Sequence, residues 1–373
     1  MQLIELAAVR HRVAVGVPLP FNVRQVDETL LLARGQVIDS VDQMEALFSR
    51  GMLVDIDEVR TAHERVMQAP AAELPKIWER SIERVGDALH NLPEGGFDAV
   101  VDEVSQPLLA LVERDADLAV FQVLRQHGNH LTQYGVNHSI HCAIAAFLTA
   151  NRLGWAASSM QSAFKAALTM NVSMLELQGQ LATQASPLTP EQREAIDSHP
   201  LRSVAMLKLA GITDPEWLQA VAQHHEHSDG SGYPAGLTDV SPLAALLRQC
   251  DIYTAKLSPR KSREALAADV AARNLFAANP GNSVASAIIK EFGIYPPGAM
   301  VKLASGETGI VVRRGPSAHM PQVAVVTNAR GATLDEPLRR DTAQPAYAVV
   351  EVLPATAAKV GVAPEALLAM VCG

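Results

Sequence analysis

Aromatic residues are scarce in this chain of 373 residues: they make up 4% of it, whereas hydrophobic residues make up 48%. The core must therefore be built mainly from Ala, Leu and Val, a composition that favours a mainly helical protein of about two or three domains. Positive charge is also in short supply, because the net charge is −9. That balance argues against binding to DNA or to anionic membranes, since neutralising phosphate groups requires a basic surface.

Cysteine is rare as well, and the three cysteines form no CxxC pair. A small odd number of cysteines makes no disulfide framework and indicates a reduced setting. Uncharged apolar runs of about 18 residues, the length of a membrane span, are absent. The stretch 1–20 lacks the apolar centre of a signal peptide. We therefore expect a cytoplasmic protein without a membrane anchor.

Turn-forming residues and changes of periodicity divide the chain into five expected parts. A mixed α/β N-terminal accessory domain precedes a helical connector, a helical domain, a small β extension and a C-terminal helix. Their expected bounds are 1–70, 71–125, 126–292, 293–353 and 354–373. The flanking modules carry no phosphoacceptor pattern or cofactor loop, so we interpret them as interaction or scaffold modules that could mediate homodimerisation.

The helical domain has apolar residues at helical spacing in one segment after another. They predict helices at 117–127, 138–153, 157–180, 189–209, 214–224, 241–257 and 262–277. Thr189-Pro190-Glu191-Gln192 predicts a capped helix start. Outside this domain we expect strands at 13–17, 29–32, 300–304, 309–313 and 322–327, and helices at 41–49, 74–92, 97–113 and 355–371.

The histidines of the helical domain are unevenly placed. His138 and His141 are three residues apart and so share a helix face. His199 precedes a proline near an expected helix start, and His224 and His225 are adjacent at a helix end. Each has an ordinary alternative, because a single helical histidine is more often a core or surface residue than a ligand.

Asp251 lies inside an apolar predicted helix, where a carboxylate is costly unless it is paired or bound to a metal. It could instead cap a neighbouring helix or pair with Arg248, and the adjacent histidines could belong to an exposed turn. The combination favours a site, because the carboxylate, the histidines and a glycine-rich loop lie in one helical block.

The loop carries the most specific motif. HHEHSDGSGYPAGL (224–237) resembles the signature of the HD-GYP family, His-His-Glu-x-x-Asp-Gly-x-Gly-Tyr-Pro, in order and spacing. The segments YGVNHSIH (134–141), LTPEQREAIDSHP (188–200) and LLRQCDIYTAKLSPRKSR (246–263) are similar to other parts of the family. The resemblance extends over about 126–292. It implies an HD-superfamily helical bundle and a metal-dependent phosphodiesterase that converts cyclic di-GMP to pGpG or GMP.

The resemblance also implies roles for particular residues. The implied metal ligands are His138, His199, His224, His225 and Asp251. Arg260 and Arg263 would bind phosphate, for which arginine is well suited, although such residues can also be a solvated helix start. The loop residues Gly232, Tyr233 and Pro234 correspond to a family segment linked to contacts with diguanylate cyclase (GGDEF) domains, which implies such partners.

The His-Asp pair that gives the family its first letters is absent, and Met170-Asn171 stands in its place. Met174 replaces a lysine, and Tyr134 replaces a glutamate that supports a third metal in some members. In the family the aspartate bridges two metal ions, and a bridging hydroxide is the nucleophile. Asn171 is neutral and cannot bridge two cations, and the thioether of Met170 is a poor ligand for hard or borderline metals.

The remaining ligands could still hold one metal ion rather than two, and iron, manganese and zinc are all chemically reasonable. Three imidazoles, from His199, His224 and His225, would make a mononuclear site. Losing a bridging ligand should impair catalysis more than binding. The sequence therefore favours a catalytically impaired regulator that binds a cyclic dinucleotide or a protein. An active cyclic di-GMP phosphodiesterase is the alternative, and the intact loop disfavours a purely structural protein.

Overall fold

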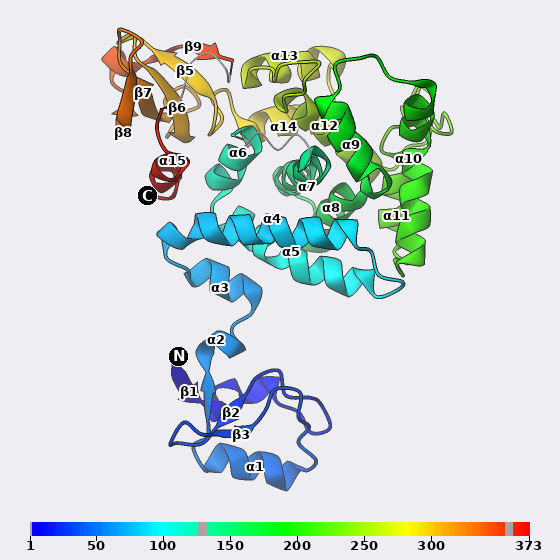
Figure 1. Cartoon of the computed structure of the whole chain (residues 1–373), viewed down its shortest axis with the longest axis vertical. Helices are drawn as coiled ribbons and strands as arrows, with labels where there is room; N and C mark the ends of the chain where they lie inside the picture. Colours follow the sequence, from blue (N-terminus) through cyan, green and yellow to red (C-terminus); the bar gives the residue numbers. More distant parts are fainter. Residues whose placement is uncertain (1, 126–132, 355–360) are drawn as a thin grey trace. The chain divides into compact units, whose positions relative to one another are not determined.

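The computed structural model describes residues 2–125, 133–354 and 361–373. They form two compact units, Met1–Ala69 and Pro70–Gly373, which are described separately. The first is small and mixed, and the second is larger and mainly helical (Figure 1). The predicted mainly α fold is confirmed, with a small antiparallel sheet in each unit. Among the described residues, no helix is long and apolar enough to cross a membrane.

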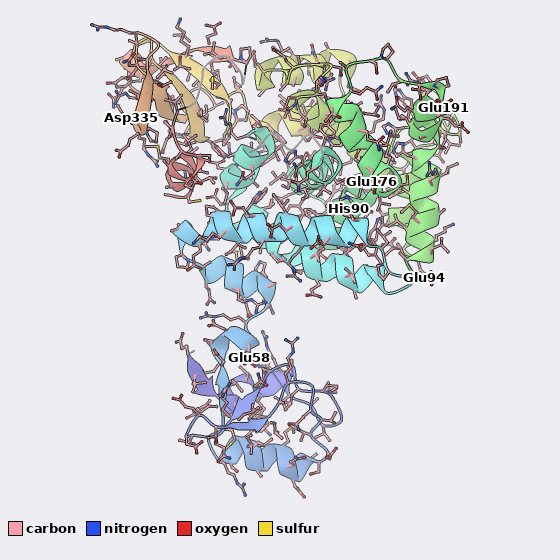
Figure 2. All side chains as sticks on the ribbon, viewed as in Figure 1. Glu58, His90, Glu94, Glu176, Glu191 and Asp335 are labelled. Carbon is pink, nitrogen blue, oxygen red and sulfur yellow. The ribbon has the colours of Figure 1, made fainter. Side chains whose placement is uncertain are left out.

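The N-terminal unit is built on an antiparallel sheet with strand order β1-β4-β2-β3. Phe21, Ile38 and Val54 lie in its core. Glu58, labelled in Figure 2, accepts hydrogen bonds from the backbone and side-chain nitrogens of Asn22 and so holds α2 beside the start of β2. The elements are β1 (Leu3–Glu5), η1 (Leu6–Arg12), β2 (Val23–Arg24), β3 (Leu30–Leu32), α1 (Val41–Ser49), β4 (Leu53–Asp55), α2 (Ile56–Val59) and α3 (Ala62–Gln68).

One strand predicted in this unit is wrong. Residues 13–17 leave η1 and turn instead of joining the sheet, and Gly16 within them has a positive φ of 80°. The strand predicted at 29–32 is present as β3, and the helix predicted at 41–49 is present as α1.

The larger unit consists of helices packed around α7, which is buried along almost its whole length. A helix that is apolar on all sides is stable only inside a core, and α7 packs against α8, α9, α12 and α14. The helices are α4 (Leu74–His90), α5 (Phe97–Arg114), α6 (Ala116–Leu124), α7 (Tyr134–Arg152), α8 (Ala157–Thr169), α9 (Leu175–Thr183), α10 (Pro190–Leu209), α11 (Pro215–Gln223), α12 (Pro242–Leu257), α13 (Ala268–Ala278) and α14 (Ser283–Phe292), with 3-10 turns η2 (Ala71–Glu73) and η4 (Val172–Met174).

The helix predicted at 157–180 is wrong in its middle, because η4 separates α8 from α9. Ser173 of η4 donates its hydroxyl to the carbonyl of His199 at 3.0 Å. The turn is thereby fastened to α10, and this tertiary contact overrides a helical pattern that continues through the break. The interruption falls at Met170-Asn171, so it decides where these two side chains point.

The capped start predicted for α10 is confirmed. Thr189 accepts a hydrogen bond from the backbone of Gln192, whose side chain accepts one from the backbone of Thr189. Glu176 and Glu191, labelled in Figure 2, are exposed in the first turns of α9 and α10, where a negative charge suits the helix dipole.

The second sheet follows the helices and has strand order β8-β7-β6-β5-β9. The strands predicted at 300–304, 309–313 and 322–327 are confirmed, while β8 and β9 are additional. Ion pairs of Arg313 with Asp115 (2.7 Å) and of Arg314 with Asp117 join β6 and the residue after it to the start of α6. The elements are β5 (Met300–Leu303), β6 (Thr308–Arg313), β7 (Gln322–Thr327), β8 (Thr333–Asp341), η5 (Pro345–Tyr347) and β9 (Val349–Leu353).

The last helix, α15 (Pro364–Cys372), packs against α6, β6 and β8. This helix corresponds to the second half of the helix predicted at 355–371, and residues 355–360 lie outside the described residues. The larger unit thus contains the proposed connector, helical domain, β extension and terminal helix. That finer division stays a prediction.

A pair of helical glycines tests how closely the helices are packed. An added Cβ at Gly135 of α7 would lie 2.5 Å from the carbonyl oxygen of Leu175, whereas one at Gly86 of α4 would meet a methyl group of Val136 at an ordinary 3.5 Å. We expect Gly135→Ala to lower the free energy of unfolding by about 1–3 kcal/mol through overpacking. The matched Gly86→Ala should raise it by about 0.5–1 kcal/mol. Urea denaturation measures both, and an unchanged Gly135→Ala would contradict the close approach.

Candidate metal centre

The five predicted metal ligands come from four helical segments and fall into two groups. One group is His199, His224 and His225, and the other combines His138 and Asp251 with Cys142. Within each group, the possible ligand atoms lie within 4.8 Å of one another. The structure therefore brings all five residues to one region but divides them between two positions.

His199 is oriented by the proline that follows it. Pro200 was expected near a helix start, but it lies in the middle of α10. Proline has no N–H, so it cannot donate to the carbonyl of Ile196 one turn earlier. That carbonyl instead lies 2.5 Å from Nδ1 of His199. Because a carbonyl can only accept, Nδ1 must carry the proton, and Nε2 of the neutral ring is left with a free lone pair.

His224 is oriented in the same way at a helix end. It caps α11, whose last carbonyls have no helical N–H partner. Its Nδ1 lies 2.7 Å from the carbonyl oxygen of Val221. The proton is again fixed on Nδ1, and the Nε2 lone pair is free.

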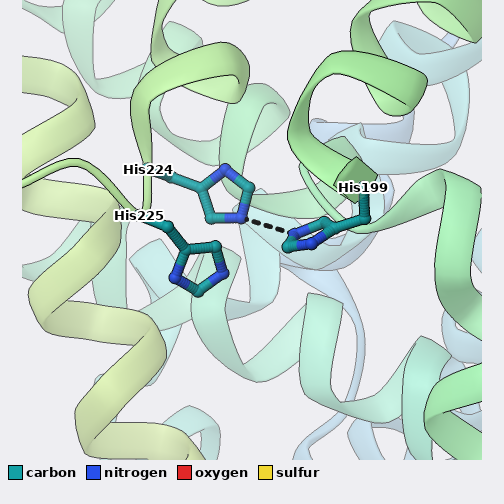
Figure 3. Close-up of side chains that lie close together, drawn as sticks. All are labelled: His199, His224 and His225. Carbon is teal, nitrogen blue, oxygen red and sulfur yellow. Dashed lines mark hydrogen bonds between the residues drawn. The ribbon is translucent and has the colours of Figure 1, made fainter. Parts of the chain in front are cut away.

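The two free nitrogens face each other. Nε2 of His199 and Nε2 of His224 are 3.0 Å apart (Figure 3). Two lone pairs at this distance repel unless a cation lies between them. Two nitrogens each about 2.1 Å from one ion would be separated by roughly 3.0–3.4 Å, so the observed spacing suits a shared metal.

His225 completes this group. Its ring centroid is 4.3 Å from that of His224 and 5.0 Å from that of His199. Tyr233 stacks on His225, with ring centroids 4.5 Å apart and planes inclined by 15°. The signature tyrosine therefore positions the third imidazole.

The three imidazoles are neutral near pH 7. Burial, with a further contribution from neighbouring imidazoles, lowers the pKa to about 4 for His199 and to about 3 for His224 and His225. Neutral imidazole is the form that binds a metal. The donor set thus fits one borderline metal ion.

In the second group, His138 and Asp251 are bonded to each other. Nε2 of His138 and Oδ1 of Asp251 are 2.7 Å apart, a direct charge-assisted hydrogen bond. Burial raises the pKa of Asp251, but the hydrogen bond from His138 and the nearby imidazoles outweigh it and hold the pKa below its usual value. The carboxylate of Asp251 therefore has a hydrogen-bond partner within the fold.

Cys142 was not among the predicted site residues. It follows His138 by one helical turn, and its sulfur lies 3.6 Å from Nε2 of His138. That four-residue spacing is the sequence signal that could have identified it. Burial and the nearby Asp251 raise the pKa of Cys142 well above its usual value, so the thiol is protonated rather than in its metal-binding form.

The two residues that replace the family's His-Asp pair lie in different surroundings. Met170 is fully buried in the core. Asn171 is 2% exposed and lines a cavity of about 190 Å³ together with His199, His225 and Asp251. The missing histidine has become a core residue, whereas the missing aspartate has become an amide inside the site.

The signature loop is held from inside by Glu226. Its two carboxylate oxygens accept hydrogen bonds from the backbone N–H groups of Ala235 (2.7 Å) and Leu237 (2.9 Å). A Cβ at Gly232 would lie 2.4 Å from the backbone nitrogen of His227, so only glycine fits there. Glu226 and Gly232 therefore fasten the loop to the histidine segment.

The two predicted phosphate-binding arginines are not equivalent. Arg260 lines the cavity and donates to the hydroxyl of Tyr134 at 2.8 Å while its guanidinium lies over the ring, 4.8 Å from the centroid. Arg263 is exposed, does not line the cavity and donates to the carbonyl of Ala255. The helix predicted at 262–277 begins at Ala268, so neither arginine lies on a helix start.

Comparison with known proteins finds similarity to one family and to two individual proteins. The HD domain family matches residues 121–279. A cyclic di-GMP phosphodiesterase of Pseudomonas aeruginosa is 29% identical over 279 residues, which are 74% of this chain and 64% of the relative. The match thus spans less than two thirds of that relative. A solved HDG"Y"P protein from Bdellovibrio bacteriovorus is 16% identical and covers 78% of this chain and 98% of its own, with a TM-score of 0.49.

Residues 121–279, less than half of the chain, match the HD domain family, and the loop at 224–237 resembles the HD-GYP signature. HD domains are metal-dependent, and the described residues include two groups that could hold a metal. The chain keeps the signature loop and lacks the His-Asp pair.

The buried histidines predict how stability depends on pH. An unfolded histidine takes up a proton below about pH 6.5, whereas the folded ones stay neutral down to about pH 4 or 3. The unfolded state therefore binds more protons, and folding stability falls as the pH drops from about 7 to 4. In metal-free protein we expect each of the three histidines to lower the free energy of unfolding by about 1 kcal/mol between pH 6.5 and 5.5.

Urea denaturation of chelator-treated protein measures this slope. His224→Gln should reduce it by about one third of the three-histidine effect, while the same change at the exposed His319 should leave it unaltered. A slope that is the same in the His224→Gln variant would contradict the assignment.

Proposed function

We propose that this protein acts in cyclic di-GMP signalling as a catalytically impaired HD-GYP regulator that binds the nucleotide at a mononuclear metal centre. The metal ligands in this proposal are His199, His224 and His225. One observation carries it: the Nε2 atoms of His199 and His224 face each other at 3.0 Å, while His138 and Asp251 are bonded to each other at 2.7 Å.

The loss of a second metal position accounts for the impaired catalysis. Two-metal hydrolysis needs a hydroxide activated between both ions. Asn171 offers no bridging carboxylate, and Met170 is withdrawn into the core. A single ion of iron, manganese or zinc could still orient a phosphate and polarise its oxygens, which supports binding more than turnover.

Nucleotide binding has support from charge. Arg260 lines the cavity beside the trihistidine group, and its guanidinium is oriented by Tyr134. Arginine pairs well with phosphate. The relative from Pseudomonas aeruginosa is named a cyclic di-GMP phosphodiesterase, which favours this nucleotide as the ligand.

The loop also supports a role in protein contacts. Tyr233 faces His225, but Ser231, Ala235 and Leu237 are exposed around it. In this proposal the loop presents those residues to GGDEF domains, and the flanking modules provide scaffolding and a homodimer contact. An active metal-dependent phosphodiesterase producing pGpG or GMP is the alternative.

Metal content and turnover test the proposal together. After loading with Fe²⁺, Mn²⁺ or Zn²⁺, we expect about one ion per chain by elemental analysis, because Asn171 offers no carboxylate to bridge a second ion and His138 and Asp251 are bonded to each other. Cyclic di-GMP should bind, and its hydrolysis should be slower by a factor on the order of 10² or more than that of the Pseudomonas relative assayed beside it. The matched variant Met170→His/Asn171→Asp should gain a second ion and faster turnover.

Two outcomes would overturn it. Two ions per wild-type chain would mean that Asn171 does not exclude the second metal. Turnover comparable to that of the relative, and abolished by His225→Ala, would establish the active phosphodiesterase instead.

A further inference from the structure

We infer that the larger unit contains a second binding site, a cavity between α4, α6 and α7 that takes a linear aliphatic polyamine. Its volume is about 590 Å³, within the roughly 300–1,000 Å³ of pockets that enclose a small molecule. It shares no lining residue with the cavity beside the trihistidine group. The inference therefore goes beyond the proposed function and does not rest on it.

Three carboxylates line one side of this cavity. Glu79, Glu83 and Asp87 follow one another at intervals of four residues on α4, so they share one helix face and are spaced about 6 Å apart along its axis. Among the described residues none of the three forms an ion pair, and Arg84 of the same helix pairs with Glu103 instead. Like charges at this spacing repel one another, so the row gains from a bound cation.

Neutral polar side chains line the cavity from α7. Gln133, Asn137 and His141 have the same four-residue spacing and so share one face of that helix, against which α4 packs. Gln122 of α6 adds a further amide. No lysine or arginine among the described residues lines the cavity, so its lining contributes no permanent positive charge. Acidic and neutral groups around one space attract a cation.

His141 is a buried group in this lining that the fold does not fully use. It is 6% exposed and lines this cavity, whereas His138 lines the cavity of the metal centre. Within the part of the chain that the structure describes, Nδ1 of His141 has no hydrogen-bond partner. Burial, with a contribution from His138, lowers the pKa of His141 to about 3, so the ring is neutral near pH 7 and does not repel a cation. A neutral imidazole has one acceptor nitrogen, which an ammonium N–H satisfies.

The row of charges favours an elongated cation over a metal ion. The described groups whose ligand atoms lie within 4.8 Å of one another do not include the three carboxylates, so one ion would not reach them all. In spermidine, three or four methylene groups separate successive ammonium groups, a spacing close to the rise of four helical residues. Trp78, Ile82 and Val136 give the same cavity an apolar surface against which methylene groups can pack.

The experiment compares spermidine, 1,4-diaminobutane and butylamine by calorimetry on the full metal-free chain at physiological ionic strength. We expect affinity to fall in that order, with butylamine at least about 10-fold weaker than spermidine, because each ammonium group adds a charge-assisted contact. Glu83→Gln removes the central carboxylate and should weaken spermidine binding about 10-fold. The matched Glu94→Gln removes the same charge from an exposed residue that does not line the cavity (Figure 2). It should weaken binding less than about 2-fold, since salt screens distant charges.

A second measurement locates the ligand. Trp78 is 3% exposed and lines the cavity, and the other two tryptophans of the chain, Trp155 and Trp217, do not line it. Spermidine should therefore change the tryptophan fluorescence of the wild type. Trp78→Phe should lose this change, and the matched Trp155→Phe should keep it. A change that persists in Trp78→Phe would place the ligand elsewhere and overturn the inference.

Three binding results would also overturn the inference. Equal weakening in Glu83→Gln and Glu94→Gln would mean that spermidine is attracted only by the net negative charge of the chain. Butylamine that binds as tightly as spermidine would contradict recognition of a row of charges. Mg²⁺ that binds more tightly than spermidine, and depends on Glu83, would make this a divalent-cation site. The proposed function is tested separately, because it depends on the loaded metal and on cyclic di-GMP.

Discussion

The site depends on two unpaired backbone carbonyls. One is free because Pro200 cannot donate to Ile196, and the other because α11 ends at its last turn beside Val221. Each carbonyl accepts a hydrogen bond from a ring Nδ1–H, and the two Nε2 atoms face each other at 3.0 Å. The rest of the centre follows from that constraint: His225 joins through the stack with Tyr233, and the loop holds both in place through Glu226.

The other candidate ligands lie in a second group. His138 and Asp251 are hydrogen-bonded to each other, Met170 is buried in the core, and Tyr134 holds the guanidinium of Arg260. The two groups therefore differ in how their members meet: the trihistidine group presents imidazole nitrogens to one another, whereas His138 and Asp251 contact each other directly.

Much of this could be read from the sequence. Helical spacing predicts the helical bundle, and the resemblance to the signature family implies the five candidate ligands, which stay a prediction. The break at η4 could not be predicted, since it depends on a hydrogen bond from Ser173 to α10, far along the chain. The same applies to the different surroundings of Arg260 and Arg263, which are decided by packing rather than by spacing. Cys142 could have been found from its four-residue spacing to His138. The strand expected at 13–17 failed because apolar residues alone do not specify pairing.

Pro200 shows how a constraint on chemistry reaches a residue that contacts no ligand. Proline leaves the Ile196 carbonyl without its helical N–H partner, and Nδ1 of His199 bonds to that carbonyl. His199 and Pro200 therefore act together: the imidazole supplies the lone pair, and the proline favours the tautomer in which Nε2 bears it. A substitution of Pro200 would supply a backbone N–H that competes with Nδ1 of His199 for the Ile196 carbonyl.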